Sequence, residues 1–249
     1  MVPRGETLFT ELKHVGMRKG RKVLEVTTCS AAGEKIVSGK AEVNVPPTAY
    51  VFTGQGSAEV GMGMELYAKS QAARTVWDRA DNHLLETYGF SILDIVRKNV
   101  SELKIHFGGR RGAKIRQNYI QLVTTTKEHG SQQLIPAISL DSDSYTFRAP
   151  EGLLFATQFT QCALVLQERG IYDDLKSQEI TPDHIVFAGH SLGEYASLTA
   201  AGDVMLIEAL VEIVFQRGLV MQKAVKRDAT GRSEFGMVAA SVKSKKSIY

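Results

Sequence analysis

The sequence has few cysteines and no long apolar run free of charge. Its two cysteines, Cys29 and Cys162, stand far apart and give neither a disulfide framework nor a metal-ligand spacing. This scarcity favours a reducing compartment, so we expect a cytoplasmic protein. The most apolar long stretch, residues 192–219, is interrupted by acidic residues such as Glu194 and Glu208. We therefore expect no membrane span.

A strong charge of one sign is also absent. The 30 Lys and Arg residues nearly balance the 27 Asp and Glu residues and leave a net charge of +3. A net charge this small is only weak evidence that the protein binds a polyanion. We therefore expect neither a nucleic acid nor a membrane as a partner. Residues 1–6 lack the apolar core of a signal peptide. We expect a soluble intracellular protein or a piece of one.

The chain changes its pattern near Pro46-Pro47. Residues 7–46 alternate in hydrophobicity around a turn at residues 31–34, which predicts an antiparallel β-meander of about three strands. Three strands are too few for a stable domain of their own. From residue 49 onward strands and helices alternate, which predicts an α/β core. We therefore place a boundary at the two prolines.

Residues 99–150 differ from the rest of this core. They are polar, contain glycines, and are basic around residues 108–116. One interpretation is a solvated insertion, and the other is a surface that docks a phosphate or a partner.

A serine between two glycines is the strongest chemical signal. Residues 185–188 form a short apolar run that predicts a fully buried strand, and residues 194–200 predict a helix. Between them, Gly189, Ser191 and Gly193 have the spacing of a nucleophile elbow, in which the turn exposes the hydroxyl above the sheet. The helix N-terminus could stabilise an oxyanion there. The alternative is a glycine-rich turn with an incidental serine.

A long helix at about residues 204–225 carries a second signal. Its apolar stripe consists of Ile207, Leu210, Val211, Val214, Gly218, Met221 and Val225. Arg217 falls on the same face, and an inward guanidinium needs an anionic partner. Structural ion pairing and recognition of a carboxylate are equally good explanations.

Taken in order, these segments resemble the malonyl/acyl transferases of fatty acid and polyketide synthesis. The matching motifs are residues 52–57, 158–161, 189–194 and 216–218. Residues 105–111 and 145–148 resemble more specifically the fungal fatty acid synthase β subunit, in which the domain is a malonyl/palmitoyl transferase.

The resemblance implies a domain organisation. Residues 1–48 are similar to the last strands of a hot-dog dehydratase domain, and residues 49–235 to an acyltransferase core of α/β-hydrolase-like fold with an insertion at about 99–150. Residues 236–249 would begin a ferredoxin-like subdomain that is almost entirely missing.

The resemblance also implies roles for individual residues. Ser191 would be the nucleophile, the backbone N–H groups of Gln55 and Leu192 the oxyanion hole, Arg217 the clamp for the malonyl carboxylate, and Gln161 a support of the pocket. Neither a metal nor a bound cofactor is implied. The substrates would be malonyl-CoA or acyl-CoA and phosphopantetheinyl acyl carrier protein. The partners would be that carrier and the α and β subunits of the synthase.

The sequence departs from the family at its end. The family's catalytic histidine follows the ferredoxin-like subdomain, and the chain stops after the opening strand of that subdomain. His184 and His190 are poorly placed on the strand and turn around Ser191, and the other histidines suit surface or packing roles. We therefore expect an inactive or incomplete fragment. The alternatives are a non-catalytic binding or assembly fragment and a lipase-like hydrolase, against which Arg217 and Gln55 argue.

Overall fold

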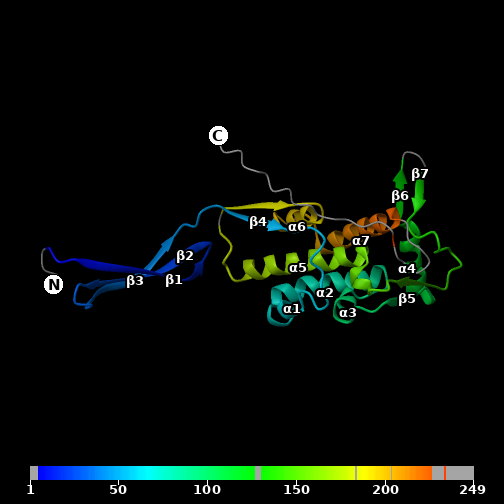
Figure 1. Cartoon of the computed structure of the whole chain (residues 1–249). Helices are drawn as coiled ribbons and strands as arrows, with labels where there is room; N and C mark the ends of the chain where they lie inside the picture. Colours follow the sequence, from blue (N-terminus) through cyan, green and yellow to red (C-terminus); the bar gives the residue numbers. More distant parts are fainter. Residues whose placement is uncertain (1–4, 127–129, 183, 203, 226–232, 234–249) are drawn as a thin grey trace.

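The computed structural model describes residues 5–126, 130–182, 184–202, 204–225 and 233. An N-terminal sheet projects from one end of a larger body that combines helices with short strands (Figure 1). This arrangement agrees with the predicted α/β fold preceded by a meander. The predicted boundaries of residues 1–48 and 49–235 stay predictions, and residues 236–249 lie outside the described part of the chain.

The projecting sheet is the predicted antiparallel meander. Strands β1 (Leu8–Arg18), β2 (Arg21–Ser30) and β3 (Lys35–Val43) pair in that order. Lys19 and Gly20 both have positive φ values, 48° and 73°, which suits the two-residue turn between β1 and β2. A hydrogen bond of 3.5 Å from the Gly20 N–H to the Glu179 carbonyl connects this turn to the body.

A parallel pair of strands carries the predicted elbow. Strand β4 (Thr48–Phe52) pairs with β9 (Ile185–Gly189). The prediction that residues 185–188 form a fully buried strand is wrong, because Val186 is 59% exposed, and its neighbour Val51 in β4 is 71% exposed. On the other face, the rings of Tyr50 and Phe187 contact Tyr172 of helix α5 (Thr157–Ser177). The two strands therefore alternate between a covered and an open face.

Helix α5 (Thr157–Ser177) is the centre of the body. It buries every residue from Gln158 to Leu166. Outside residues 99–150, the helical elements around it are α1 (Met64–Lys69), α2 (Gln71–Thr87), α3 (Ile92–Lys98), the 3₁₀ turn η1 (Leu153–Phe155), α6 (Leu192–Ala200) and α7 (Ile207–Ala224). Along the described residues, none of the helices is both long and apolar enough to cross a membrane.

Two helices differ from what the sequence predicts. The helical spacing of apolar residues between Leu154 and Leu166 predicts a helix that ends near Gly170, but α5 continues for two further turns. An added Cβ atom at Gly170 would lie 3.5 Å from the Cβ atom of Ala73, an ordinary van der Waals distance, so this glycine faces α2 inside a continuous helix. In α7, the stripe is buried from Ile207 to Gly218, and Met221 is 36% exposed.

The predicted insertion contains regular elements and shares the hydrophobic core of the body. It contains β5 (Glu102–His106) paired with β8 (Ser144–Arg148), helix α4 (Gly109–Gln121), and the hairpin of β6 (Val123–Thr126) and β7 (Gly130–Gln133). The basic stretch, expected as a polar surface segment, forms the first turns of α4. Gly112, Ile115 and Tyr119 on one side of this helix are buried, and this spacing is helical.

Candidate functional site

Ser191 occupies a strained turn between β9 and α6. It is the N-cap of α6 and has φ 55° and ψ −107°, a backbone conformation that non-glycine residues rarely adopt. Such strain persists only where the surroundings enforce it and is concentrated at functional sites. The turn therefore has the geometry of a nucleophile elbow, and its serine is exposed at the end of the parallel strands.

The two flanking glycines make this turn possible. A Cβ atom at Gly189 would lie 2.2 Å from the backbone carbon of Gly193, and a Cβ atom at Gly193 would lie 2.2 Å from the carbonyl oxygen of Phe52. Because these neighbours are backbone atoms, they cannot move aside as a flexible side chain could. The close approach of β4, β9 and α6 thus accounts for both glycines of the motif.

Arg217 reaches Ser191 from helix α7. Its Nη2 donates to Ser191 Oγ at 2.8 Å, and its Nη1 donates to Gln161 Oε1 at 2.8 Å. Gln161 is fully buried in α5, and its Nε2 contacts Met221 Sδ at 3.2 Å and Gln55 Oε1 at 3.4 Å. Residues far apart in the sequence therefore converge at the elbow.

The charge of Arg217 has no carboxylate partner among the described residues. Its partners there are neutral: the Gln161 amide, the Ser191 hydroxyl and the ring of Tyr195, whose centroid lies 5.5 Å from the Arg217 Cζ. The first of the two explanations for this inward guanidinium, a structural ion pair, therefore finds no support in the described part of the chain. The arrangement suits recognition of an external anion beside the serine hydroxyl.

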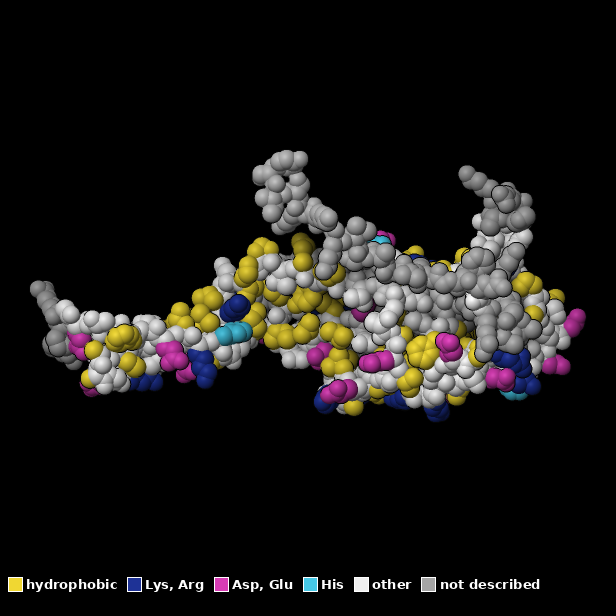
Figure 2. Space-filling view, viewed as in Figure 1, with side chains coloured by type: hydrophobic (Ala, Val, Ile, Leu, Met, Phe, Trp, Pro, Cys, Tyr) yellow, Lys and Arg dark blue, Asp and Glu magenta, His cyan; other side chains and the backbone are white. Residues whose placement is uncertain are grey.

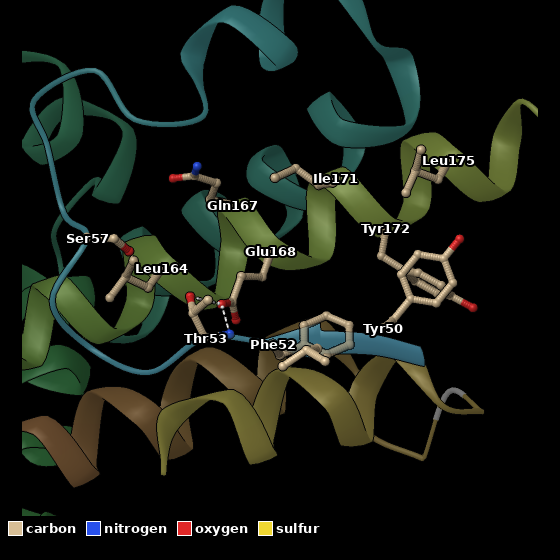
Figure 3. Close-up of a pocket in the computed structure, with 11 residues that line it drawn as sticks. Tyr50, Phe52, Thr53, Ser57, Leu164, Gln167, Glu168, Ile171, Tyr172 and Leu175 are labelled. Atoms are coloured by element: carbon tan, nitrogen blue, oxygen red, sulfur yellow. Dashed lines mark hydrogen bonds between the residues drawn. The ribbon is translucent and has the colours of Figure 1, made fainter. Parts of the chain in front are cut away.

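A partly buried carboxylate anchors the loop that contains Gln55. Glu168 of α5 accepts hydrogen bonds through Oε1 from the Thr53 N–H at 2.8 Å and the Thr53 hydroxyl at 2.7 Å (Figure 3). Burial raises the pKa of Glu168, and the Thr53 hydrogen bonds partly oppose this effect. The loop after β4 is thereby fixed at the same sheet end as Ser191, since Phe52 is paired with Gly189.

The predicted oxyanion donors lie at this sheet end as well. Leu192 is the first residue of α6, so its N–H has no acceptor within the helix. Gln55 follows β4 and contacts Gln161 through its side chain. The positions fit the predicted roles of both N–H groups, which remain predictions.

The described histidines do not reach Ser191. His184 and His190 are exposed, and neither makes a hydrogen bond to the serine. His83 Nε2 pairs with Glu212 Oε1 at 2.7 Å, His14 Nε2 contacts the Gly16 carbonyl, and His106 lies exposed at the end of β5, while His129 is outside the described residues. The described ranges also contain no cluster of His, Cys, Asp and Glu that could hold a metal ion.

A cavity of about 260 Å³ lies beside the site rather than at it. Figure 3 shows it between β4 and α5, with Tyr50, Thr53, Glu168 and Tyr172 among its lining residues. Neither Ser191 nor Arg217 lines this cavity. The candidate site around Ser191 therefore lies at the end of the parallel strands, outside this cavity.

Sequence reasoning missed two residues of this constellation. Glu168 follows Gln161 by seven residues on α5, and Tyr195 follows Ser191 by four on α6. These spacings place each on the same helix face as its predecessor. Helical periodicity applied outward from the motifs could have found both.

Comparison with known proteins identifies the family of the chain. The acyl transferase domain family matches residues 49–248. The fatty acid synthase subunit β of Schizosaccharomyces pombe is 51% identical over 246 residues, and that of Saccharomyces cerevisiae 52% over 242 residues. These matches cover 97% and 96% of this chain and 12% of each relative, so the chain spans about an eighth of their length.

Among solved structures, the malonyl CoA-acyl carrier protein transacylase of Coxiella burnetii is similar. It is 28% identical with a TM-score of 0.46, and the match covers 73% of this chain and 40% of that protein. The family match alone covers most of the chain. The chain belongs to the acyl transferase domain family.

Proposed function

We propose that this chain is part of a fungal-type fatty acid synthase β subunit and serves malonyl and longer acyl transfer between coenzyme A and acyl carrier protein. The observation that carries the proposal is the contact of Arg217 with Ser191 at 2.8 Å, with no carboxylate paired to the guanidinium among the described residues. This contact puts a nucleophile and an anion-binding group within the length of one malonyl unit. The names of the yeast relatives support the choice of parent protein.

The proposed first step is acylation of Ser191. Its Oγ attacks the thioester carbonyl carbon, the carbon–sulfur bond breaks, and coenzyme A leaves as a thiol that receives the serine proton. The acyl group remains as a seryl ester until the phosphopantetheine thiol of the carrier attacks it in the reverse sense. The chemistry requires neither a metal nor a bound cofactor.

Three groups would stabilise this step. Arg217 would bind the free carboxylate of malonyl-CoA, for which its planar, two-pronged donor geometry is suited. The N–H groups of Gln55 and Leu192 would bind the developing oxyanion, which is typically worth a few kcal/mol. Gln161 would keep Arg217 beside the serine through the 2.8 Å hydrogen bond.

The partners follow from the same proposal. Acyl carrier protein would deliver or accept the acyl group, and the remaining α and β polypeptides of the synthase would surround the domain. The projecting sheet of β1–β3 would belong to a preceding dehydratase domain of hot-dog fold. Its separation from the body in Figure 1 is compatible with this assignment.

A second function, binding or assembly without catalysis, is favoured by one observation. Serine needs a general base for efficient attack, and no described histidine makes a hydrogen bond with Ser191. A protein of this kind would bind malonyl-CoA through Arg217 without forming an ester.

One experiment separates these functions. The chain and its Ser191→Ala variant are incubated with radiolabelled malonyl-CoA, precipitated, digested and analysed for labelled peptides. The proposal expects a label on the peptide that contains Ser191, absent from the variant. Binding of malonyl-CoA without any labelled peptide would favour the non-catalytic function instead.

A further inference from the structure

Tyr195 lies one helical turn after the nucleophile. Ser191 caps α6 and Tyr195 is its fourth residue, so both side chains project from one side of the helix. Tyr195 is half-buried and packs against the core of the body. Its hydroxyl makes no hydrogen bond among the described residues. The side chain therefore contacts the site through its ring.

The ring of Tyr195 is a third contact of the Arg217 guanidinium, beside its two hydrogen bonds. The guanidinium donates two hydrogen bonds, from Nη1 to Gln161 Oε1 and from Nη2 to Ser191 Oγ, both at 2.8 Å. Its Cζ lies 5.5 Å from the centroid of the Tyr195 ring, within the range of a cation–π contact. Two in-plane contacts and one aromatic contact together define the position of the cation.

We infer that Tyr195 is a positioning residue that holds Arg217 beside Ser191 and thereby sets the preference for carboxylate-bearing over uncharged acyl donors. The inference rests on the proposed function and goes beyond it, because the family resemblance assigned no role to Tyr195. The ring attracts the cation without neutralising it, so the guanidinium stays available for an incoming carboxylate. A carboxylate side chain in the same place would compete with that ligand.

The effect should depend on the donor. A malonyl group needs Arg217 in place when its thioester reaches Ser191, whereas an acetyl group makes no use of the cation. Loss of a partly exposed cation–π contact typically corresponds to a threefold to tenfold change in an equilibrium. We therefore expect Tyr195→Leu to lower malonyl loading roughly threefold to tenfold and to leave acetyl loading nearly unchanged.

The test is a competition on the full chain. Equimolar malonyl-CoA and acetyl-CoA are offered together, and mass spectrometry of the Ser191 peptide gives the ratio of malonyl to acetyl ester. This ratio does not depend on the fraction of folded protein, so a purely structural effect leaves it unchanged. Tyr195→Leu should lower the ratio roughly threefold to tenfold, and Tyr195→Phe, which keeps the ring, should stay within about twofold of the parent.

Two controls isolate the contact. Leu198→Ala alters a 51% exposed residue of the same helix and should leave the ratio unchanged. In an Arg217→Ala background, Tyr195→Leu should have no further effect, because the two side chains act through each other. A lower ratio in Arg217→Ala with an unchanged ratio in Tyr195→Leu would overturn the inference and leave the proposed function intact. Absence of any ester would instead overturn the proposed function, and this inference with it.

A second measurement examines the contact without a substrate. The ring current of Tyr195 should shift the side-chain NMR signals of Arg217, which are assigned by their loss in Arg217→Lys. Tyr195→Leu should move these signals toward ordinary arginine positions. Identical Arg217 signals in the parent and in Tyr195→Leu would overturn the inference independently of acylation.

Discussion

The projecting sheet and the body differ in how much of their sequence the fold constrains. In β1–β3 only Ser30 among the strand residues is buried, and Phe9 and Leu12 are more than 60% exposed. In the body, α5 buries an unbroken run of residues and an edge-to-face pair of Phe90 and Phe159 lies in its core. Figure 2 shows the sheet as a narrow arm with hydrophobic side chains on its visible face. A polar or small substitution should therefore be tolerated in the arm and costly in the body.

The largest effect is expected from adding one methyl group at the elbow. Gly193→Ala would place a Cβ atom 2.2 Å from the Phe52 carbonyl oxygen, whereas Gly39→Ala in β3 would meet no atom within 4 Å. We expect Gly193→Ala to lower the free energy of unfolding by about 3 kcal/mol or more and Gly39→Ala to change it by less than about 0.5 kcal/mol. Urea denaturation followed by fluorescence of Trp77, the single tryptophan of the chain, measures both.

That contrast has a clear counter-result. Equal stability of the two alanine variants would mean that the backbones of β4 and α6 are not in the close contact described. The presence of glycine at positions 189 and 193 would then need another explanation.

Removal of the arm should have a smaller effect on the body. The link between them includes a 3.5 Å hydrogen bond from Gly20 to Glu179, and a single hydrogen bond contributes about 1 kcal/mol. We expect deletion of residues 1–44 to change the unfolding free energy reported by Trp77 by about 1 kcal/mol or less. In the full chain, the arm should also unfold separately and promote association through its exposed edges.

Sedimentation and circular dichroism test the second half of this expectation. Deletion of the arm should reduce concentration-dependent association. A monomeric full chain whose β-sheet signal and Trp77 fluorescence change in one coincident transition would show that arm and body fold as a unit.

The smallest difference is expected between two ion pairs. Arg79 binds Glu208 through two hydrogen bonds of 2.8 and 2.9 Å and joins α2 to α7, whereas Arg18 and Glu42 form a more exposed contact of 3.5 Å in the arm. Glu208→Gln should cost about 0.5 kcal/mol at neutral pH, and Glu42→Gln should cost less than can be measured. Paired urea curves for the two variants measure this difference.

The same pair predicts a dependence on pH. The hydrogen bond from Arg79 lowers the pKa of Glu208 below its ordinary value. Its stabilisation is therefore present above the ordinary carboxyl pKa and is lost as the pH falls through the lowered value. The difference between the parent and Glu208→Gln should disappear in acid, and a difference that persists there would point to packing rather than charge.

Much of the fold could be predicted because local patterns determine it. The alternation in residues 7–46 indicated the meander, and the run before Ser191 with its two glycines indicated the strand, turn and helix of the elbow. Burial was harder to predict. Val51 and Val186 are apolar, as core residues are, but no other described element of the chain packs over them. Helix α4 was hidden by its basic residues, since only Ile115 and Tyr119 on one face carry the apolar signal.

In the candidate site, too, local motifs could be predicted from the sequence and tertiary contacts could not. Ser191, Gln161 and Arg217 came from motifs, and the structure brings them into contact. Glu168 of α5 binds Thr53 in the loop that contains Gln55, and Tyr195 of α6 contacts Arg217, and both are tertiary contacts. The partner of an inward charge depends on which helix packs against it, so the sequence alone left the role of Arg217 open.

The central claim is that Arg217 makes the Ser191 site selective for a carboxylate-bearing donor. The direct measurement is the rate of ester formation on Ser191 with malonyl-CoA and with an uncharged acyl-CoA, in the parent and in Arg217→Ala, either in this chain or in an intact parental domain. We predict that Arg217→Ala reduces malonyl loading by about 2–4 kcal/mol of transition-state stabilisation, while loading of the uncharged acyl group persists or rises. An equal loss for both donors would contradict the account.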